Sequence, residues 1–179
     1  MSTSTRRRTL FAGIFATVAI AGVAAGIGTA VADRGAQHAE ATLVDASGAT
    51  IGFARFTEDG SGVVHVNVKA HGLTPGEHGI HIHAVGTCSP DFNAAGSHHN
   101  PDSAPHGSHS GDLPNMVVNT TGKGRLNATS ERATLSAGPR SVFDANGSAI
   151  VIHADPDDFV TQPTGNSGAR VACGVIVPG

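Results

Sequence analysis

Residues 79–88 read GIHIHAVGTC, and within them Ile80, His81, Ile82 and His83 alternate between apolar and imidazole side chains. Strict alternation predicts a β-strand with one face toward a core. In an extended chain, residues i and i+2 point to the same side, about 7 Å apart. The histidines therefore occupy the face where a solvated strand normally carries Thr, Ser, Lys or Glu. Their spacing suits two imidazoles that converge on one metal ion, although this stretch by itself only suggests such a site.

Short apolar and β-branched runs extend the β pattern over the rest of the chain. Residues 64–69 (VHVNVK) alternate with period two. The other expected strands are residues 41–45, 50–56, 116–119, 148–153 and 171–177. Turn signals rich in Gly, Pro, Asn and Asp separate these runs, and no segment has a sustained helical period. The pattern predicts an all-β fold, an antiparallel sandwich or barrel.

Two polar segments, residues 87–114 and 154–169, are too long for hairpin loops. Long loops without secondary structure inside a compact domain are usually functional or disordered. Eight of the 11 histidines lie between residues 71 and 109, which a disordered linker would not require. We therefore expect the loops to be ordered by what their imidazoles bind.

Residues 1–32 have the pattern of a secretory signal peptide. Three arginines, Arg6 to Arg8, precede an uncharged run that ends in the cleavage signature Ala-Val-Ala, and cleavage is expected after Ala32. The arginines also fit a twin-arginine export route. The alternative is an uncleaved anchor, since residues 10–31 are long enough to cross a bilayer. Without the leader the chain would have no stable membrane insertion. Its expected location is the periplasm, the cell envelope or the extracellular space.

Residues 33–40 are expected to be a flexible linker, and residues 41–179 a single domain. Three of the 11 Lys and Arg residues lie in the leader, so 8 remain against 14 Asp and Glu, a net charge of −6. A negative chain with no basic runs and no Trp or Tyr argues against nucleic acid or an anionic membrane as partner. The two cysteines, Cys88 and Cys173, are expected to form a disulfide in an oxidising compartment.

The metal-binding side chains gather around the two loops and the strand ends. The candidates are His81, His83, His98, His99, His106, His109, Asp112 and His153. Imidazoles with one carboxylate suit copper and zinc, whereas calcium and magnesium prefer oxygen ligands. A single zinc ion needs four ligands, and the candidates suffice for two metal ions.

Five motifs occur in a recognisable order: HGIHIHAVG, AAGSHHNP, HSGDLPN, VIHADPDDF and TGNSGARVACGVI. Together they resemble the secreted, bacterial-type copper/zinc superoxide dismutases, from about Gly48 to the C-terminus. The resemblance implies a Greek-key β-barrel of about eight antiparallel strands with two long functional loops. It also implies an enzyme that converts superoxide to oxygen and hydrogen peroxide, with copper and zinc as cofactors.

The resemblance assigns a role to each matching residue. It implies copper ligation by His81, His83, His98 and His153. It implies zinc ligation by His98, His106, His109 and Asp112, so that His98 would bridge the two ions and later deliver a proton. Arg170 would meet the anionic substrate beside copper, and Asp157 would link a copper histidine to a zinc histidine. Cys88 and Cys173 match the family's disulfide.

The chain departs from the family pattern in two places. Only two residues separate His106 from His109, where many members have an insertion. Residues 159–163, FVTQP, replace a segment that is often charged, so substrate attraction would depend mainly on Arg170. The five other histidines, His38, His65, His71, His78 and His99, are expected to pack, to bond to the backbone or to face solvent.

Two questions stay open from the sequence. The alternative function is a non-enzymatic protein of the cell envelope that binds or delivers copper or zinc, which the loss of a copper histidine or of Arg170 would favour; neither is lost. The oligomeric state, homodimer or monomer, depends on surface patches that the sequence does not locate.

Overall fold

The computed structural model of the chain describes Met1 and residues 37–179. The predicted signal peptide, its alternative as an anchor and residues 33–36 of the expected linker lie outside the described residues. Among the residues described, no helix is long and apolar enough to cross a membrane.

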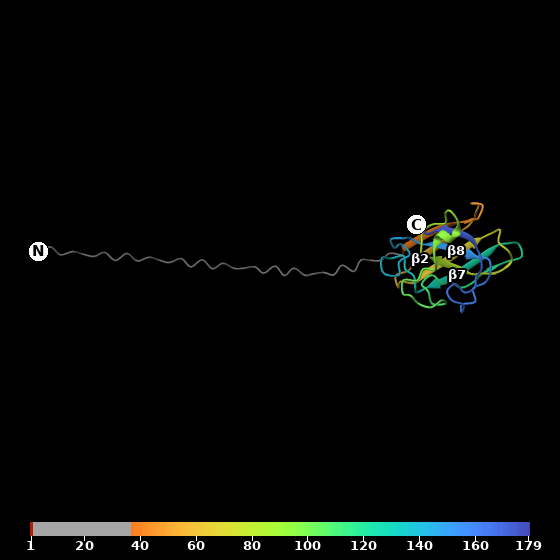
Figure 1. Cartoon of the computed structure of the whole chain (residues 1–179). Helices are drawn as coiled ribbons and strands as arrows, with labels where there is room; N and C mark the ends of the chain where they lie inside the picture. The colour runs from red at the N-terminus through yellow and green to blue at the C-terminus, as the bar shows by residue number, and fades with distance from the viewer. Residues whose placement is uncertain (2–36) are drawn as a thin grey trace. The chain divides into compact units, whose positions relative to one another are not determined.

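The described residues form ten β-strands and one short 3-10 helix (Figure 1). In chain order these are β1 (Gln37–Asp45), β2 (Thr50–Glu58), β3 (Val64–Ala70), β4 (Gly76–His78), β5 (Ile80–His83), η1 (Phe92–Ala95), β6 (Met116–Val118), β7 (Gly124–Ser130), β8 (Ala149–His153), β9 (Arg170–Val175) and β10 (Val177–Pro178).

The strands form a nearly closed antiparallel barrel. Hydrogen-bonded neighbours follow the order β4-β6-β7-β3-β2-β1-β9-β8-β5, and β10 pairs with β1 at its side. Only Gly79 separates β4 from β5 in the chain, so the two ends of this order are brought together. The predicted all-β barrel is confirmed.

Alternating side chains fill the inside of the barrel. In β3, Val64, Val66 and Val68 are buried while the residues between them are exposed. The same alternation in β1 starts earlier than expected. Residues 37–40, assigned to a flexible linker from the sequence, belong to β1, so that part of the linker prediction is wrong. Ala39 is buried in the core and pairs with Phe56 of β2, which explains why the strand extends this far.

Strands β5 and β8 differ from the others because all their residues are buried. Ile80 and Ile82 of β5 join the main core. On the outer face of β8, Ala149 and Val151 form a second apolar cluster with Ala95 of η1 and Cys173. The outer face of these strands is therefore covered by loops instead of water.

Three long connections leave the barrel. Residues 84–115 join β5 to β6, and residues 154–169 join β8 to β9, in agreement with the two predicted loops. The third, residues 131–148, joins β7 to β8 and was not anticipated. The carboxylate of Glu58 anchors it by accepting hydrogen bonds from the backbone amides of Leu135 and Ser136.

Candidate metal centre

The loop of residues 84–115 returns along β5 and brings its histidines beside those of the strand. Isolated β-bridges pair His83 with His98 and His81 with Asp112. Between these pairs, the Ile82 amide donates to the Gly111 carbonyl and the His99 amide donates to the Ile82 carbonyl, both at 2.8 Å. A Cβ on Gly111 would lie 2.1 Å from the Ile82 carbonyl oxygen, so only glycine allows this approach.

Strand β8 contributes His153 at its end, and β9 contributes Arg170 at its start. The two residues are paired across the strands, directly after a register shift between Ile152 and His153. Such irregularities re-aim side chains and often occur next to functional sites. The register therefore places Arg170 next to His153.

Among the residues that the structure describes, two groups of side chains could hold a metal ion, and His98 belongs to both. The four-histidine group consists of His81, His83, His98 and His153. The Asp112 group consists of His98, His106, His109 and Asp112. Within each group the candidate ligand atoms lie within 4.8 Å of one another. The structure thus brings together every residue that the resemblance named as a ligand.

In the four-histidine group, each strand histidine has one ring nitrogen held by an oxygen. The Nδ1 of His83 donates to the Gly96 carbonyl at 3.0 Å, and the Nδ1 of His153 donates to the Gly168 carbonyl at 3.3 Å. This leaves the Nε2 atoms of these two rings with free lone pairs, which face each other at 3.4 Å. Two facing lone pairs repel unless a cation lies between them.

Asp157 links the two groups. Its Oδ2 accepts from His81 Nε2 at 2.7 Å, and its Oδ1 accepts from His106 Nε2 at 2.8 Å. The carboxylate side chain is fully buried. It therefore fixes the tautomers of one histidine from each group and directs the other nitrogen of each ring toward its group.

The Asp112 group is compact around one carboxylate oxygen. Asp112 Oδ1 lies 3.0 Å from His98 Nδ1, 3.2 Å from His109 Nδ1 and 3.5 Å from His106 Nδ1. The other oxygen, Oδ2, accepts from the backbone amides of Gly107 and His109. The carboxylate thus holds the turn together while it faces three imidazoles.

Within the described part of the chain, three buried ring nitrogens have no hydrogen-bond partner: His81 Nδ1, His98 Nε2 and His106 Nδ1. Buried polar atoms are almost always satisfied, so an unpaired one calls for a specific explanation. Each of the three belongs to a side chain that faces a candidate metal position. Nitrogen donors with free lone pairs are the ligands that copper and zinc prefer, so the residues present fit these ions.

The protonation states also suit metal binding. Burial lowers the pKa of His81 and His83 to about 2 and that of His153 to about 4, because a buried imidazole loses the hydration of its charged form. Burial alone would raise the pKa of Asp112, but the hydrogen bond from His98 and nearby histidines outweigh it and hold that pKa at about 2. At neutral pH these imidazoles are neutral and Asp112 is ionised, as metal ligation requires.

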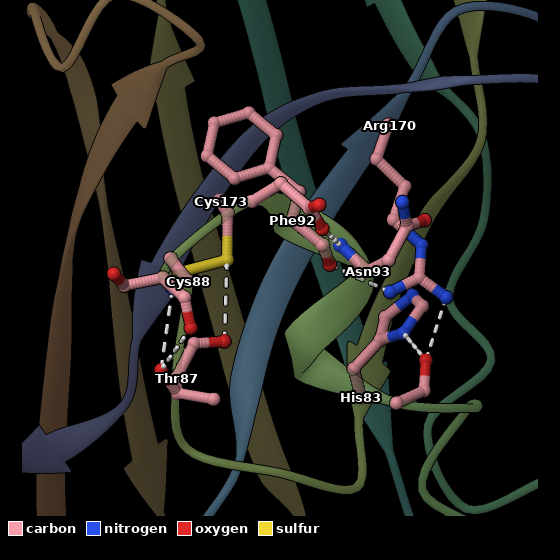
Figure 2. Close-up of a disulfide and its surroundings, with 10 residues drawn as sticks. His83, Thr87, Cys88, Phe92, Asn93, Arg170 and Cys173 are labelled. Carbon is pink, nitrogen blue, oxygen red and sulfur yellow. Dashed lines mark hydrogen bonds between the residues drawn. A yellow bond between two sulfur atoms is a disulfide. The ribbon is translucent and has the colours of Figure 1, made fainter.

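Figure 2 shows how Arg170 is held near the four-histidine group. Its Nη1 donates to the Phe92 carbonyl at 2.7 Å and its Nη2 to the Gly96 carbonyl at 2.6 Å. The Gly96 carbonyl also accepts from His83. Burial lowers the pKa of Arg170, yet an arginine stays charged in proteins. The side chain is half-buried, which leaves a fixed positive charge beside the imidazoles.

The predicted disulfide between Cys88 and Cys173 is confirmed, with a Cα–Cα distance of 5.8 Å. It ties the start of the loop that carries η1 to β9 (Figure 2). Cys173 is fully buried beneath this loop. The carbonyl oxygens that orient Arg170 therefore lie in a segment with a covalent attachment to the barrel.

Two of the remaining histidines, His78 and His99, have structural contacts. His78 is buried; its Nδ1 donates to the His153 carbonyl at 2.6 Å, and its Nε2 lies 2.8 Å from the Thr74 carbonyl and 3.3 Å from the Thr74 hydroxyl. His99 is also buried, and its Nε2 lies 3.3 Å from the Arg140 carbonyl. Neither side chain belongs to a metal-binding group among the residues described. These contacts agree with the packing and backbone-bonding roles expected from the sequence.

Sequence reasoning missed several contributors to the site. The carbonyl oxygens of Phe92 and Gly96 carry no signal in the side-chain pattern. Gly111 is part of the motif HSGDLPN, but only the folded structure shows that the Ile82 carbonyl approaches it too closely for any side chain.

The fold and the site define a class of protein: an antiparallel β-barrel metalloprotein with two adjacent histidine-rich groups that share one imidazole. Known proteins of this class match the chain. The family model described as Copper/zinc superoxide dismutase (SODC) matches residues 50–176. The Cu-Zn superoxide dismutase of Deinococcus radiodurans is 40% identical over 166 residues, 83% of this chain and 88% of that protein.

Two further relatives agree. A Cu-Zn superoxide dismutase of Aquifex aeolicus is 40% identical over 147 residues, 77% of this chain and 85% of that protein. The crystal structure of a SOD-like protein from Bacillus subtilis superposes with a TM-score of 0.73 at 35% identity, covering 77% of this chain and 97% of that chain.

The chain belongs to the copper/zinc superoxide dismutase family. It is an oxidoreductase that converts superoxide to oxygen and hydrogen peroxide, and its metal cofactors are copper and zinc. The predicted family, enzyme class and cofactors are confirmed.

Proposed function

We propose that the four-histidine group binds the copper ion and the Asp112 group binds the zinc ion, with His98 as a ligand of both. The observation that carries this assignment is the set of buried, unpaired ring nitrogens, His81 Nδ1, His98 Nε2 and His106 Nδ1. His98 has Nδ1 toward Asp112 and Nε2 unpaired, so its two nitrogens can serve different ions.

The donor sets support this distribution of the two metals. Three imidazoles with one carboxylate form a closed four-ligand set, the usual coordination of a structural zinc ion. Four imidazoles without a carboxylate suit copper, whose common protein ligands include imidazole. Because zinc has no accessible second oxidation state, the four-histidine group is the redox site.

Copper, when bound, supplies the capacity to accept an electron from one superoxide and to donate it to another. The protein residues bind the anion and supply one of the two protons that hydrogen peroxide requires, and the second proton comes from water. The Arg170 guanidinium attracts superoxide electrostatically, and its carbonyl contacts hold it in place. His98 Nε2 can hold a proton when no metal ion occupies that nitrogen, because Nδ1 is engaged on the Asp112 side. That position allows Nε2 to protonate the reduced substrate on its way to hydrogen peroxide.

A pair of variants tests the assignment. His153→Ala should abolish most copper binding and most superoxide decay but leave zinc content close to wild type, because His153 belongs only to the four-histidine group. His109→Ala should have the reverse effect on metal content. Metal analysis of both purified variants, with superoxide decay measured in parallel, checks this. Loss of zinc in His153→Ala together with retained copper would contradict the assignment.

We also propose that residues 1–32 direct export and are removed after Ala32, and that the rest of the chain forms one domain. The leader pattern supports this, as does the Cys88–Cys173 disulfide, since disulfides persist in oxidising compartments. Intact mass of the protein recovered from the exporting cell should correspond to a chain that starts at Asp33. A mass that includes residues 1–32 would contradict the proposal.

A further inference from the structure

The loop of residues 154–169 contacts both the backbone and the imidazole ring of His106. We propose that Gln162, in this loop, is a positioning residue for His106; the inference rests on the zinc assignment above. The backbone amide of His106 donates to Gln162 Oε1 at 2.7 Å. Gln162 Nε2 donates back to the His106 carbonyl at 3.3 Å. One side-chain amide thus satisfies both backbone groups of a metal-facing residue.

The Gln162 amide is itself oriented by its own loop. Its Nε2 also donates to the Val160 carbonyl at 3.2 Å. This third contact fixes which end of the amide faces the His106 N–H. The contacts join two loops that are 56 positions apart in the chain.

Loop 154–169 also closes around the His106 ring. Asp157 accepts from Nε2, so the ring and the backbone are held from the same loop. A Cβ on Gly165 would lie 2.4 Å from His106 Nε2, and a Cβ on Gly107 would lie 2.7 Å from the Phe159 carbonyl oxygen. Both glycines have positive φ, +64° and +86°, so they suit the turn as well as the close approach.

The contact with Gln162 matters because the turn that carries His106 and His109 has no other side chain that binds the His106 amide among those described. Within the turn, Asp112 Oδ2 accepts from the amides of Gly107 and His109 but not from that of His106. Asp112 is a metal-facing residue, so its hold on the turn is coupled to metal binding. Gln162 supplies an anchor that is independent of the metal-facing side chains. It therefore pre-orders His106 before zinc binds.

The test compares zinc affinity in copper-free protein, measured by competition with a chelator, for wild type and two Gln162 variants. Gln162→Ala removes both contacts to the His106 backbone and should weaken zinc binding about tenfold, the lower end of the range typical for groups that orient a ligand. Gln162→Glu keeps an acceptor for the His106 amide but loses the donor, so an intermediate loss is expected. The visible absorption spectrum of the cobalt-substituted protein should shift in the same order.

Thr161→Val is the matched control. The Thr161 hydroxyl bonds to Asp158 within the same loop and has no described contact with His106. This variant should keep wild-type zinc affinity, and all three variants should keep wild-type copper affinity in zinc-free protein. That contrast separates a hold on His106 from general loosening of the loop.

Two outcomes would overturn the role of Gln162: zinc affinity within twofold of wild type in Gln162→Ala, or an equal loss in Thr161→Val. Failure of the zinc assignment itself would look different. Zinc affinity would then be unchanged by His109→Ala, which would overturn the zinc site and the role of Gln162 together.

Discussion

Hydrogen bonds to carbonyl and carboxylate oxygens orient the individual imidazole rings of this site. His83 and His153 each donate one ring proton to a backbone carbonyl, and His81 and His106 donate theirs to Asp157. In each ring the second nitrogen is left as a lone-pair donor. The tautomer of each histidine is therefore a property of its neighbours, which is how a protein prepares imidazoles for a metal ion.

Arg170 follows the same logic, because carbonyl oxygens hold its terminal nitrogens. Replacement by isoleucine removes the fixed charge, and with it a charge-assisted contact to the substrate of about 1.5–3 kcal/mol. We expect the rate of superoxide decay in Arg170→Ile to fall roughly 10- to 100-fold. Copper content should stay at the wild-type level, since His83 still donates to the Gly96 carbonyl. Superoxide decay per bound copper measures the effect.

The control for this prediction is Arg170→Lys. It keeps the charge but not the planar guanidinium that reaches two carbonyl groups. Its rate should lie between those of wild type and Arg170→Ile. An unchanged rate in Arg170→Ile would remove Arg170 from the mechanism.

Among the elements, β5 and the loops that cover it determine which side chains of the site are buried and how they are held. The outer face of β5 carries His81 and His83, which are fully buried because residues 84–115 lie against the strand. The 3-10 helix η1 belongs to this loop and supplies the Phe92 carbonyl, followed by that of Gly96 at its C-terminal end. The Cys88–Cys173 disulfide attaches the loop to β9, which begins with Arg170.

Removal of this attachment should therefore affect stability and activity together. In the chain-entropy model, the disulfide contributes up to about 4.5 kcal/mol to the free energy of unfolding, since it closes a loop of 85 residues. We expect the double variant Cys88→Ser with Cys173→Ser to unfold at a lower temperature. It should also dismutate superoxide more slowly per bound copper, because the carbonyl groups that hold Arg170 lose their tether.

Calorimetry and superoxide decay check the two parts of this prediction. The double variant avoids a free thiol that could react with other molecules. Wild type under reducing conditions should behave in the same way. An unfolding temperature equal to that of the oxidised wild type would contradict the prediction.

For the whole molecule, the barrel stabilises a cluster of neutral imidazoles that would be charged in acid. The pKa values of His81 and His83 are lowered to about 2, and that of His153 to about 4, by burial. In the unfolded chain these groups titrate near pH 6.5. The unfolded state therefore binds more protons than the folded state as the pH falls below that value.

This difference predicts how the stability of the metal-free protein depends on pH. The contribution of these histidines is complete above about pH 6.5 and is lost as the pH falls toward 4 and then 2. Each histidine can cost at most about 1.4 kcal/mol per pH unit within its window. We expect the midpoint of denaturant unfolding to fall steadily from pH 6.5 to pH 4.

Denaturant titrations of the metal-free protein at successive pH values measure this slope. His153→Gln removes one of the three groups and should reduce the slope. A midpoint that does not change between pH 7 and pH 4 would show that the buried imidazoles do not govern acid stability.

Much of the site is predictable from local sequence because a strand's period and short motifs are local properties. The alternation at residues 80–83 predicts a strand that carries two imidazoles on one face. The motifs around His98, His106, His109 and His153 supply the other metal-facing side chains. The strand at Gly124–Ser130 was missed, although Leu126 is buried while Arg125 and Asn127 are exposed, an alternation that its sequence carries.

The chain sequence by itself determined the β pattern, the two long polar loops that cover the site, the pairing of Cys88 with Cys173 and the side chains that surround the metal positions. The tertiary structure alone decided that β1 begins at Gln37, that two backbone carbonyls hold Arg170 and that Gln162 bonds to the backbone of His106. The physical reason is that these features join segments far apart in the chain. Their partners are backbone atoms or a single distant side chain, which leave no periodic or compositional trace in the sequence.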